Sequence, residues 1–189
     1  MEQIKKVKSM SIWIFIVPFV AVNTCLILIT QFHGLFPNRA DIIHNTFPYI
    51  DGGASISRTA RVFPTYLIFK PAMFFTSYLL VRYWYLNKEI LLKIGGEHKH
   101  IKKIIFFGVA SAVALTVHSI FLGVKFDYEL YKLFRRVIML SFIIFEIVAQ
   151  TYLVIILYSF KEKIMDLINP NFLKAKLVLV SILIIVAVI

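Results

Sequence analysis

The stretch from Val137 to Tyr158 is long enough to cross a lipid bilayer as a helix, and it contains one charged residue, Glu146. A membrane-spanning helix needs about 20 mostly apolar residues. A carboxylate near the centre of such a helix costs roughly 2.5–3.5 kcal/mol on insertion scales. The position of Glu146 therefore indicates a partner or a function inside the membrane.

Several other apolar runs approach the same length, and the chain as a whole is 60% hydrophobic with a mean hydropathy of +0.83. A soluble domain would not carry this much apolar sequence. Because lipid offers no partner for free backbone groups, the runs are predicted to be helices. We expect an all-α, multi-pass transmembrane helical bundle that forms a single domain over residues 1–189. Five helices are expected, at about 11–32, 64–86, 104–124, 137–159 and 172–189, with an outer loop over 33–63.

The net charge of +11 is concentrated in the amino-terminal tail and in the second and fourth connections. Lys and Arg accumulate on the cytoplasmic side of membrane proteins, so the N-terminus is predicted to be cytoplasmic. The positive charge then belongs to loops, and no nucleic-acid partner is expected. Tyr83, Trp84 and Tyr85, which follow Arg82, are expected to form an aromatic belt at the inner membrane interface.

Polar residues on four predicted helices fall at similar depths. Counted at 1.5 Å per residue, Asn23, Lys70, His118 and Glu146 lie roughly 9–14 Å from the outer helix ends. Gln150 follows Glu146 by one turn on the same face. Two interpretations remain open. This outer-half polar layer is either a polar pocket open to the outer face, or a structural ion pair between Lys70 and Glu146 with His118 and Asn23 beside it.

The outer loop is the longest connection, and it holds hydroxyl and guanidinium groups that could bind phosphate or sulfate through charge-assisted hydrogen bonds. These are Ser55, Ser57, Arg58, Thr59 and Arg61. The alternative is an ordinary solvated loop whose arginines lie near lipid headgroups. His33, His44 and Asp51 match no standard metal spacing, and the chain has no GxSxG, HExxH or P-loop motif, so no metal or other cofactor is expected.

A short motif in this loop resembles that of a known family. Pro48-Tyr49-Ile50-Asp51-Gly52-Gly53 follows the first helix, and the second helix carries Val81-Arg82-Tyr83. This pattern is similar to the family of damage-regulated autophagy modulators, Sfk-type proteins and the lipid-remodelling proteins of GPI-anchor maturation, over residues 10–90. The family's serine before the aspartate and its sixth helix are absent. The resemblance implies roles in lipid handling or membrane trafficking, with no simple active site.

Taken together, these features predict a non-enzymatic integral membrane protein that binds a lipid or a protein partner through the outer-half polar layer and the first outer loop. The candidate binding residues are Tyr49, Asp51, Arg58, Arg61, Lys70, His118, Glu146 and Gln150. Expected partners are membrane lipids and other membrane protein subunits. Two alternatives remain open: a membrane-embedded enzyme acting on lipid headgroups, and a small subunit of a larger complex. Because the last apolar run is short, we also expect the rest of an assembly or of the native chain to cover it.

Overall fold

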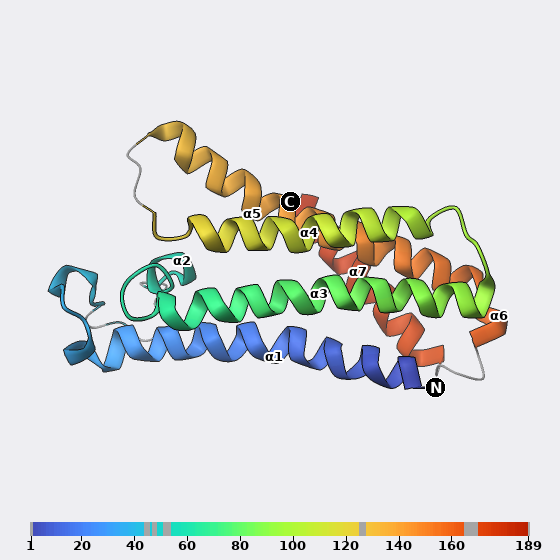
Figure 1. Ribbon diagram of the computed structural model, residues 1–189, viewed down its shortest axis with the longest axis horizontal. Coiled ribbons are helices and arrows are strands. Elements are labelled where there is room, and N and C mark those ends of the chain that lie inside the picture. Colours follow the sequence, from blue (N-terminus) through green and yellow to red (C-terminus); the bar gives the residue numbers. More distant parts are fainter. Residues whose placement is uncertain are drawn as a thin grey trace.

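The computed structural model describes residues 2–43, 46, 49–50, 54–124, 128–164 and 170–188, and every regular element among them is helical (Figure 1). The five long helices are α1 (Glu2–Gln31), α3 (Tyr66–Gly95), α4 (Ile101–Phe121), α5 (Glu129–Ser159) and α7 (Pro170–Val188). Four short ones are η1 (His33–Leu35), η2 (Arg39–Asp41), α2 (Ile56–Thr59) and α6 (Lys161–Ile164). The predicted all-α bundle is confirmed.

The long helices pack in chain order. α3 lies between α1 and α4, α5 packs on α4, and α7 packs on α5 (Figure 1). Successive helices run in opposite directions, so the bundle has two distinct ends. The loop end is where α1 ends, α3 begins and α4 connects to α5. The amino-terminal end holds the start of α1 and the connection between α3 and α4. From the loop end, the first turns of α5 diverge from α4, at the upper left of Figure 1.

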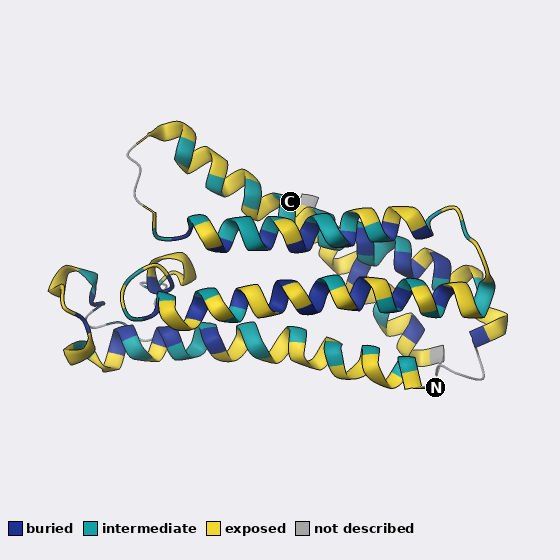
Figure 2. Ribbon diagram, viewed as in Figure 1, coloured by how far each residue is buried: buried dark blue, intermediate teal, exposed yellow. Residues whose placement is uncertain are grey.

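Three helices of the described chain are long and apolar enough to cross a membrane, namely α1, α4 and α5. The structure is therefore compatible with an integral membrane protein. The other two predicted crossings, α3 and α7, are not among these three helices and stay predictions. The helix α3 contains Lys70, Arg82 and several further polar residues, yet the number of its buried residues, ten, is larger than that of any other helix (Figure 2). The helix lies between α1 and α4, and its buried polar side chains, Thr76, Ser77 and Asn87, donate to carbonyl oxygens of α3 itself.

Three helices extend beyond the apolar runs from which they were predicted. α1 begins at Glu2 instead of residue 11, α3 continues to Gly95 instead of residue 86, and α5 begins at Glu129 instead of residue 137. An apolar run marks only the part of a helix that suits lipid. The flanking segments are rich in Lys, Glu and Leu, which favour helix, so the backbone continues without a break. α3 ends where Gly96 adopts a positive φ of 78°, a common helix terminator.

The helices α3 and α4 pack closely at Gly108. A Cβ at this position would come within 2.4 Å of the Trp84 ring, which is fully buried. A small residue at this point allows the two helices to approach closely. The predicted aromatic belt is therefore wrong for two of its three members. Trp84 and Tyr83 are buried core residues, and only Tyr85 is exposed.

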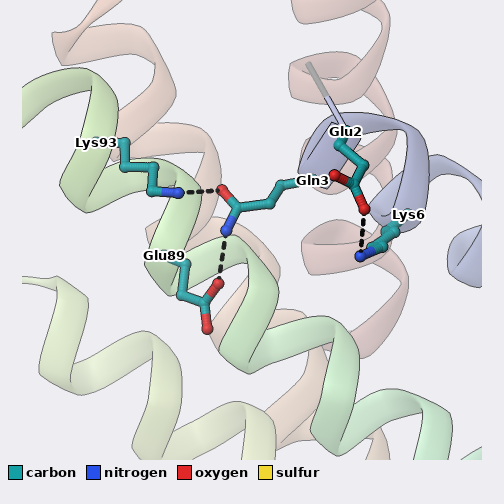
Figure 3. A network of polar contacts seen from close by, with 5 residues as sticks. All are labelled: Glu2, Gln3, Lys6, Glu89 and Lys93. Carbon is teal, nitrogen blue, oxygen red and sulfur yellow. Dashed lines mark hydrogen bonds and ion pairs between the residues drawn. The ribbon is translucent and has the colours of Figure 1, made fainter.

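At the amino-terminal end, α1 and α3 are joined by the amino-terminal clasp, which consists of Gln3, Glu89 and Lys93 (Figure 3). Gln3 Nε2 donates to Glu89 Oε2 at 2.8 Å, and Lys93 Nζ donates to Gln3 Oε1 at 3.0 Å. Glu2 and Lys6 form a separate ion pair on α1 at 2.7 Å. Each side chain of the clasp thus has a partner on the neighbouring helix.

Candidate anion-binding pocket

The loop end contains a cavity of about 700 Å³, which we call the loop-end pocket. It lies between the segment around α2 and the start of α5. Its charged lining residues are Asp41, Arg58, Arg61, Lys132 and Arg135, and its aromatic ones are Phe63 and Tyr131. Two parts of the chain far apart in sequence therefore supply basic side chains to one cavity.

Local backbone features hold the first of these parts in place. The hydroxyl of Ser55 accepts a hydrogen bond from the Arg58 backbone N–H at 3.2 Å and so caps the single turn of α2. Beyond α4, Gly123 has a positive φ of 88°, and a Cβ there would lie 2.9 Å from the Arg61 carbonyl oxygen. Only glycine suits both this conformation and this approach. The close contact brings the backbone of Arg61 against the connection that leads to α5.

Arg135 links α5 to the same segment. Its Nη2 donates to Ser57 Oγ at 3.4 Å, and its guanidinium carbon lies 5.9 Å from the centre of the Tyr131 ring. Tyr131 is fixed in turn, because its hydroxyl donates to the Phe121 carbonyl oxygen at 2.8 Å. The Nε of Arg135 is buried and has no hydrogen-bond partner. Arg135 therefore has one N–H group that no described residue satisfies.

The charges around the pocket are unbalanced. Among the described residues, the ion pairs are Glu2–Lys6 and Glu129–Lys132, the latter at 2.6 Å. Lys132 is thus neutralised locally, whereas Arg58, Arg61 and Arg135 make no ion pair. Asp41 is the one carboxylate of the described lining. The pocket is therefore a concave surface with an excess of guanidinium groups.

The loop residues that were predicted to bind a ligand do not all lie at the pocket. Arg58 and Arg61 both line the pocket, as the phosphate-binding interpretation requires. Tyr49 lies elsewhere, because its hydroxyl donates to Asn23 Oδ1 on α1. Asp51 lies outside the described residues. Sequence reasoning missed Lys132 and Arg135 as binding candidates, although their basic cluster at the start of the fourth helix was visible as a signal of membrane topology.

Lys70 and Glu146 do not form the ion pair that one of the two open interpretations required. Lys70 Nζ donates to the Ile120 carbonyl oxygen at 3.2 Å, whereas Glu146 accepts hydrogen bonds from Ser111 Oγ at 2.8 Å and Gln150 Nε2 at 3.0 Å. Ile120 and Ser111 are about 13 Å apart along α4 at 1.5 Å per residue. The two charges therefore lie at different depths. A depth counted from residue 137 misplaces Glu146, because α5 begins at Glu129 and the carboxylate is farther along its helix.

The expected single polar layer therefore separates into two groups. His118 lies within electrostatic range of Arg135, near the loop end, and its Nδ1 is buried without a hydrogen-bond partner. Glu146 and Gln150 form the second group, deeper in the bundle, with Ser111 of α4. Asn23 donates to the Phe19 carbonyl oxygen of its own helix at 2.7 Å.

Comparison with known proteins found no match for this chain. No protein-family model, no curated protein and no solved structure matches the chain.

Proposed function

We propose that this chain is a non-enzymatic integral membrane protein that binds the anionic headgroup of a lipid in the loop-end pocket. The observation that carries the proposal is the presence of Arg58, Arg61 and Arg135, none of them in an ion pair with a described residue, around a cavity of about 700 Å³. A role in lipid handling or membrane trafficking would follow from such binding.

The chemistry of the lining suits a phosphate group. A guanidinium presents several N–H donors in a planar fork that matches phosphate oxygens in a bidentate arrangement. Cavities of roughly 300–1,000 Å³ are typical of small-ligand sites. Phe63 and Tyr131 add apolar surface to the same lining. A glycerophosphate headgroup combines these two requirements, since a charged phosphate adjoins an apolar backbone and acyl chains.

The location also supports a lipid over a soluble anion. The pocket lies where α4 ends and α5 begins, and both helices are apolar enough to cross a membrane. Lipid phosphates lie at the level where membrane-spanning helices end. With the N-terminus in the cytoplasm, as proposed from the loop charges, the pocket would face the outer leaflet. The resemblance to lipid-remodelling membrane proteins over residues 10–90 points in the same direction.

Binding is favoured over catalysis by the composition of the pocket. Its described lining holds one carboxylate, Asp41, and neither a histidine nor a cysteine. Acyl or phosphoryl transfer by general acid–base chemistry requires a nucleophile and a base within hydrogen-bond reach. The lining instead provides donors that would hold a phosphate without attacking it.

The test measures lipid retention by the full chain. The protein is purified in nanodiscs, and bound phosphatidylglycerol and phosphatidylcholine are quantified by native mass spectrometry. Arg61→Gln and Arg135→Gln are each expected to lower phosphatidylglycerol affinity by about tenfold, because a hydrogen bond to a charged group contributes roughly 1.5–3 kcal/mol.

Arg136→Gln is the matched control, because Arg136 is adjacent to Arg135 in sequence but exposed and outside the pocket lining. Its affinity is expected to stay at the wild-type level. Equal retention by all three variants would overturn the proposal, provided that their melting temperatures show them to be folded.

A further inference from the structure

The helix α7 contacts the bundle through one narrow face. The buried side chains of that face are Leu173 and Val180, and Lys176 lies between them, half-buried. These three positions are spaced by three and four residues, so they lie on one side of a helix. Lys174 lies off this face and is exposed. A lysine therefore occupies the middle of the surface through which α7 packs.

This surface is directed at α5. Among the long helices, α5 is the one with which α7 makes extensive contact. Within a membrane, apolar side chains gain little from each other, because lipid tails are equally apolar. Leu173 and Val180 alone would not determine which helix α7 packs against, or in what register. The polar group on the same face must supply that specificity.

Among the described residues, Lys176 has one candidate counter-ion. It lies within electrostatic range of Glu146 on α5, although the two do not form a direct ion pair. Glu146 is the one acidic residue of α5 beyond its first turn, and α7 contains none. Hydrogen bonds from Ser111 and Gln150 fix the Glu146 carboxylate in position. The buried indole N–H of Trp84 lies beside it, outside ordinary hydrogen-bond geometry.

We propose that Lys176 and Glu146 form an interhelical charge pair that docks α7 onto α5 inside the membrane. An intramembrane acid and base that face the same helix interface compensate each other's charge. The pair gives α7 a defined partner and register that its apolar residues cannot provide. This inference uses residues outside the loop-end pocket and is independent of lipid binding.

The experiment reads the α5–α7 contact directly. A photo-crosslinking amino acid replaces Val180 in the full chain, and the yield of intramolecular crosslinks to α5 is mapped by mass spectrometry in native membranes. Lys176→Met and Glu146→Gln are each expected to lower that yield several-fold, because each leaves one intramembrane charge without its counter-ion. Lys174→Met is the matched control and is expected to leave the yield unchanged.

A charge exchange keeps the test decisive even where a single variant folds poorly. Lys176→Glu combined with Glu146→Lys restores an opposite-charge pair, and it is expected to recover most of the crosslink that either single exchange loses. Failure of this double variant to exceed the single ones would overturn the proposal. A yield that is the same in Lys176→Met and in Lys174→Met would overturn it as well.

Discussion

The two ends of the bundle are both rich in polar residues, but they use them differently. At the amino-terminal end, Gln3, Glu89 and Lys93 join α1 to α3 through direct hydrogen bonds. At the loop end, Arg58 and Arg61 line a cavity and make no ion pair within the part of the chain that the structure describes. The difference shows that charge alone does not indicate a binding site. What distinguishes the loop end is a described pocket lining in which basic residues outnumber acidic ones.

Aromatic rings also accommodate cations at the amino-terminal end. His100 stacks on Tyr152 with ring centres 5.0 Å apart, and Lys103 Nζ lies 5.3 Å from the centre of the same ring. The face of an aromatic ring attracts a cation, and the contact is worth about 0.5–1 kcal/mol at an exposed site. Basic residues here therefore cover aromatic surface. They are consistent with a structural role, as is the contact of Arg135 with the Tyr131 ring at the loop end.

The largest predicted effect concerns the packing between α3 and α4, the helices that connect the two ends. Gly108→Ala would place a Cβ 2.4 Å from the fully buried Trp84 ring. Overpacking of this kind typically costs about 1–3 kcal/mol. We expect a lower melting temperature in detergent together with weaker lipid binding, because α3 and α4 connect both ends. Gly34→Ala is the control, since a Cβ added at Gly34 would meet nothing within 4 Å. Equal melting temperatures for the two variants would contradict the prediction.

A charge reversal in the pocket should separate binding from stability. Arg58→Glu replaces an exposed cation of the pocket lining with a carboxylate, which repels an anionic headgroup. We expect phosphatidylglycerol affinity to fall by about tenfold or more, with an unchanged melting temperature. Lys5→Glu, at an exposed position on α1, serves as the control at the opposite end. If both reversals reduced affinity equally, general surface charge and not the pocket would attract the lipid.

The next prediction concerns a substitution at the opposite end of the bundle, in the amino-terminal clasp. Gln3→Ala removes both hydrogen bonds that join α1 to α3 at this end. Because these hydrogen bonds are exposed, we expect their loss to lower the free energy of unfolding by about 0.5–1.5 kcal/mol. Lipid affinity should not change. Thermal unfolding and native mass spectrometry measure the two quantities. Gln31→Ala, at an exposed position near the other end of the same helix, should leave both unaffected. A loss of lipid affinity in Gln3→Ala would remove the contrast between the two ends.

The smallest predicted effect is a pH dependence of stability at the amino-terminal end. Partial burial, together with Lys99, Lys103 and His98, lowers the pKa of His100 below its ordinary value of 6.5. As the pH falls through about 6.5, His100 therefore binds a proton more readily in the unfolded chain than in the folded one. Stability should therefore decrease slightly below that pH and stay constant above it. Melting temperatures measured across this range in wild type and in His100→Gln test this, and the same slope in both would exclude His100 as its source.

Much of the architecture could be predicted from the sequence because the helices are marked by long apolar runs. The ends were less predictable, since the charged segments before Ser11 and after Leu86 continue as helix in contact with water or headgroups. Arg58 and Arg61 were recognisable as anion-binding candidates because they are adjacent in one loop. Arg135 was not, because its role depends on how the start of α5 approaches that loop.

The error over Glu146 has a similar cause. Depth along a helix can be counted from sequence, but rotation about the helix axis and the true starting residue cannot. Glu146 lies beside Ser111 because α5 packs on α4, whereas Lys70 reaches the carbonyl oxygen of Ile120 near the end of α4. The lysine within electrostatic range of Glu146 is Lys176, from a helix that follows it in the chain.

The central placement of α3 has a consequence for how the chain enters a membrane during synthesis. α3 is less apolar than α1, α4 or α5, yet it emerges from the ribosome second among the long helices. In the folded bundle, α3 packs between α1 and α4. A ribosome that has made only α1 and α3 would thus present the insertion machinery with a helix that lipid alone accommodates poorly. Stable integration of α3 should wait for α4, so the first half of the bundle enters the bilayer as a unit and not helix by helix.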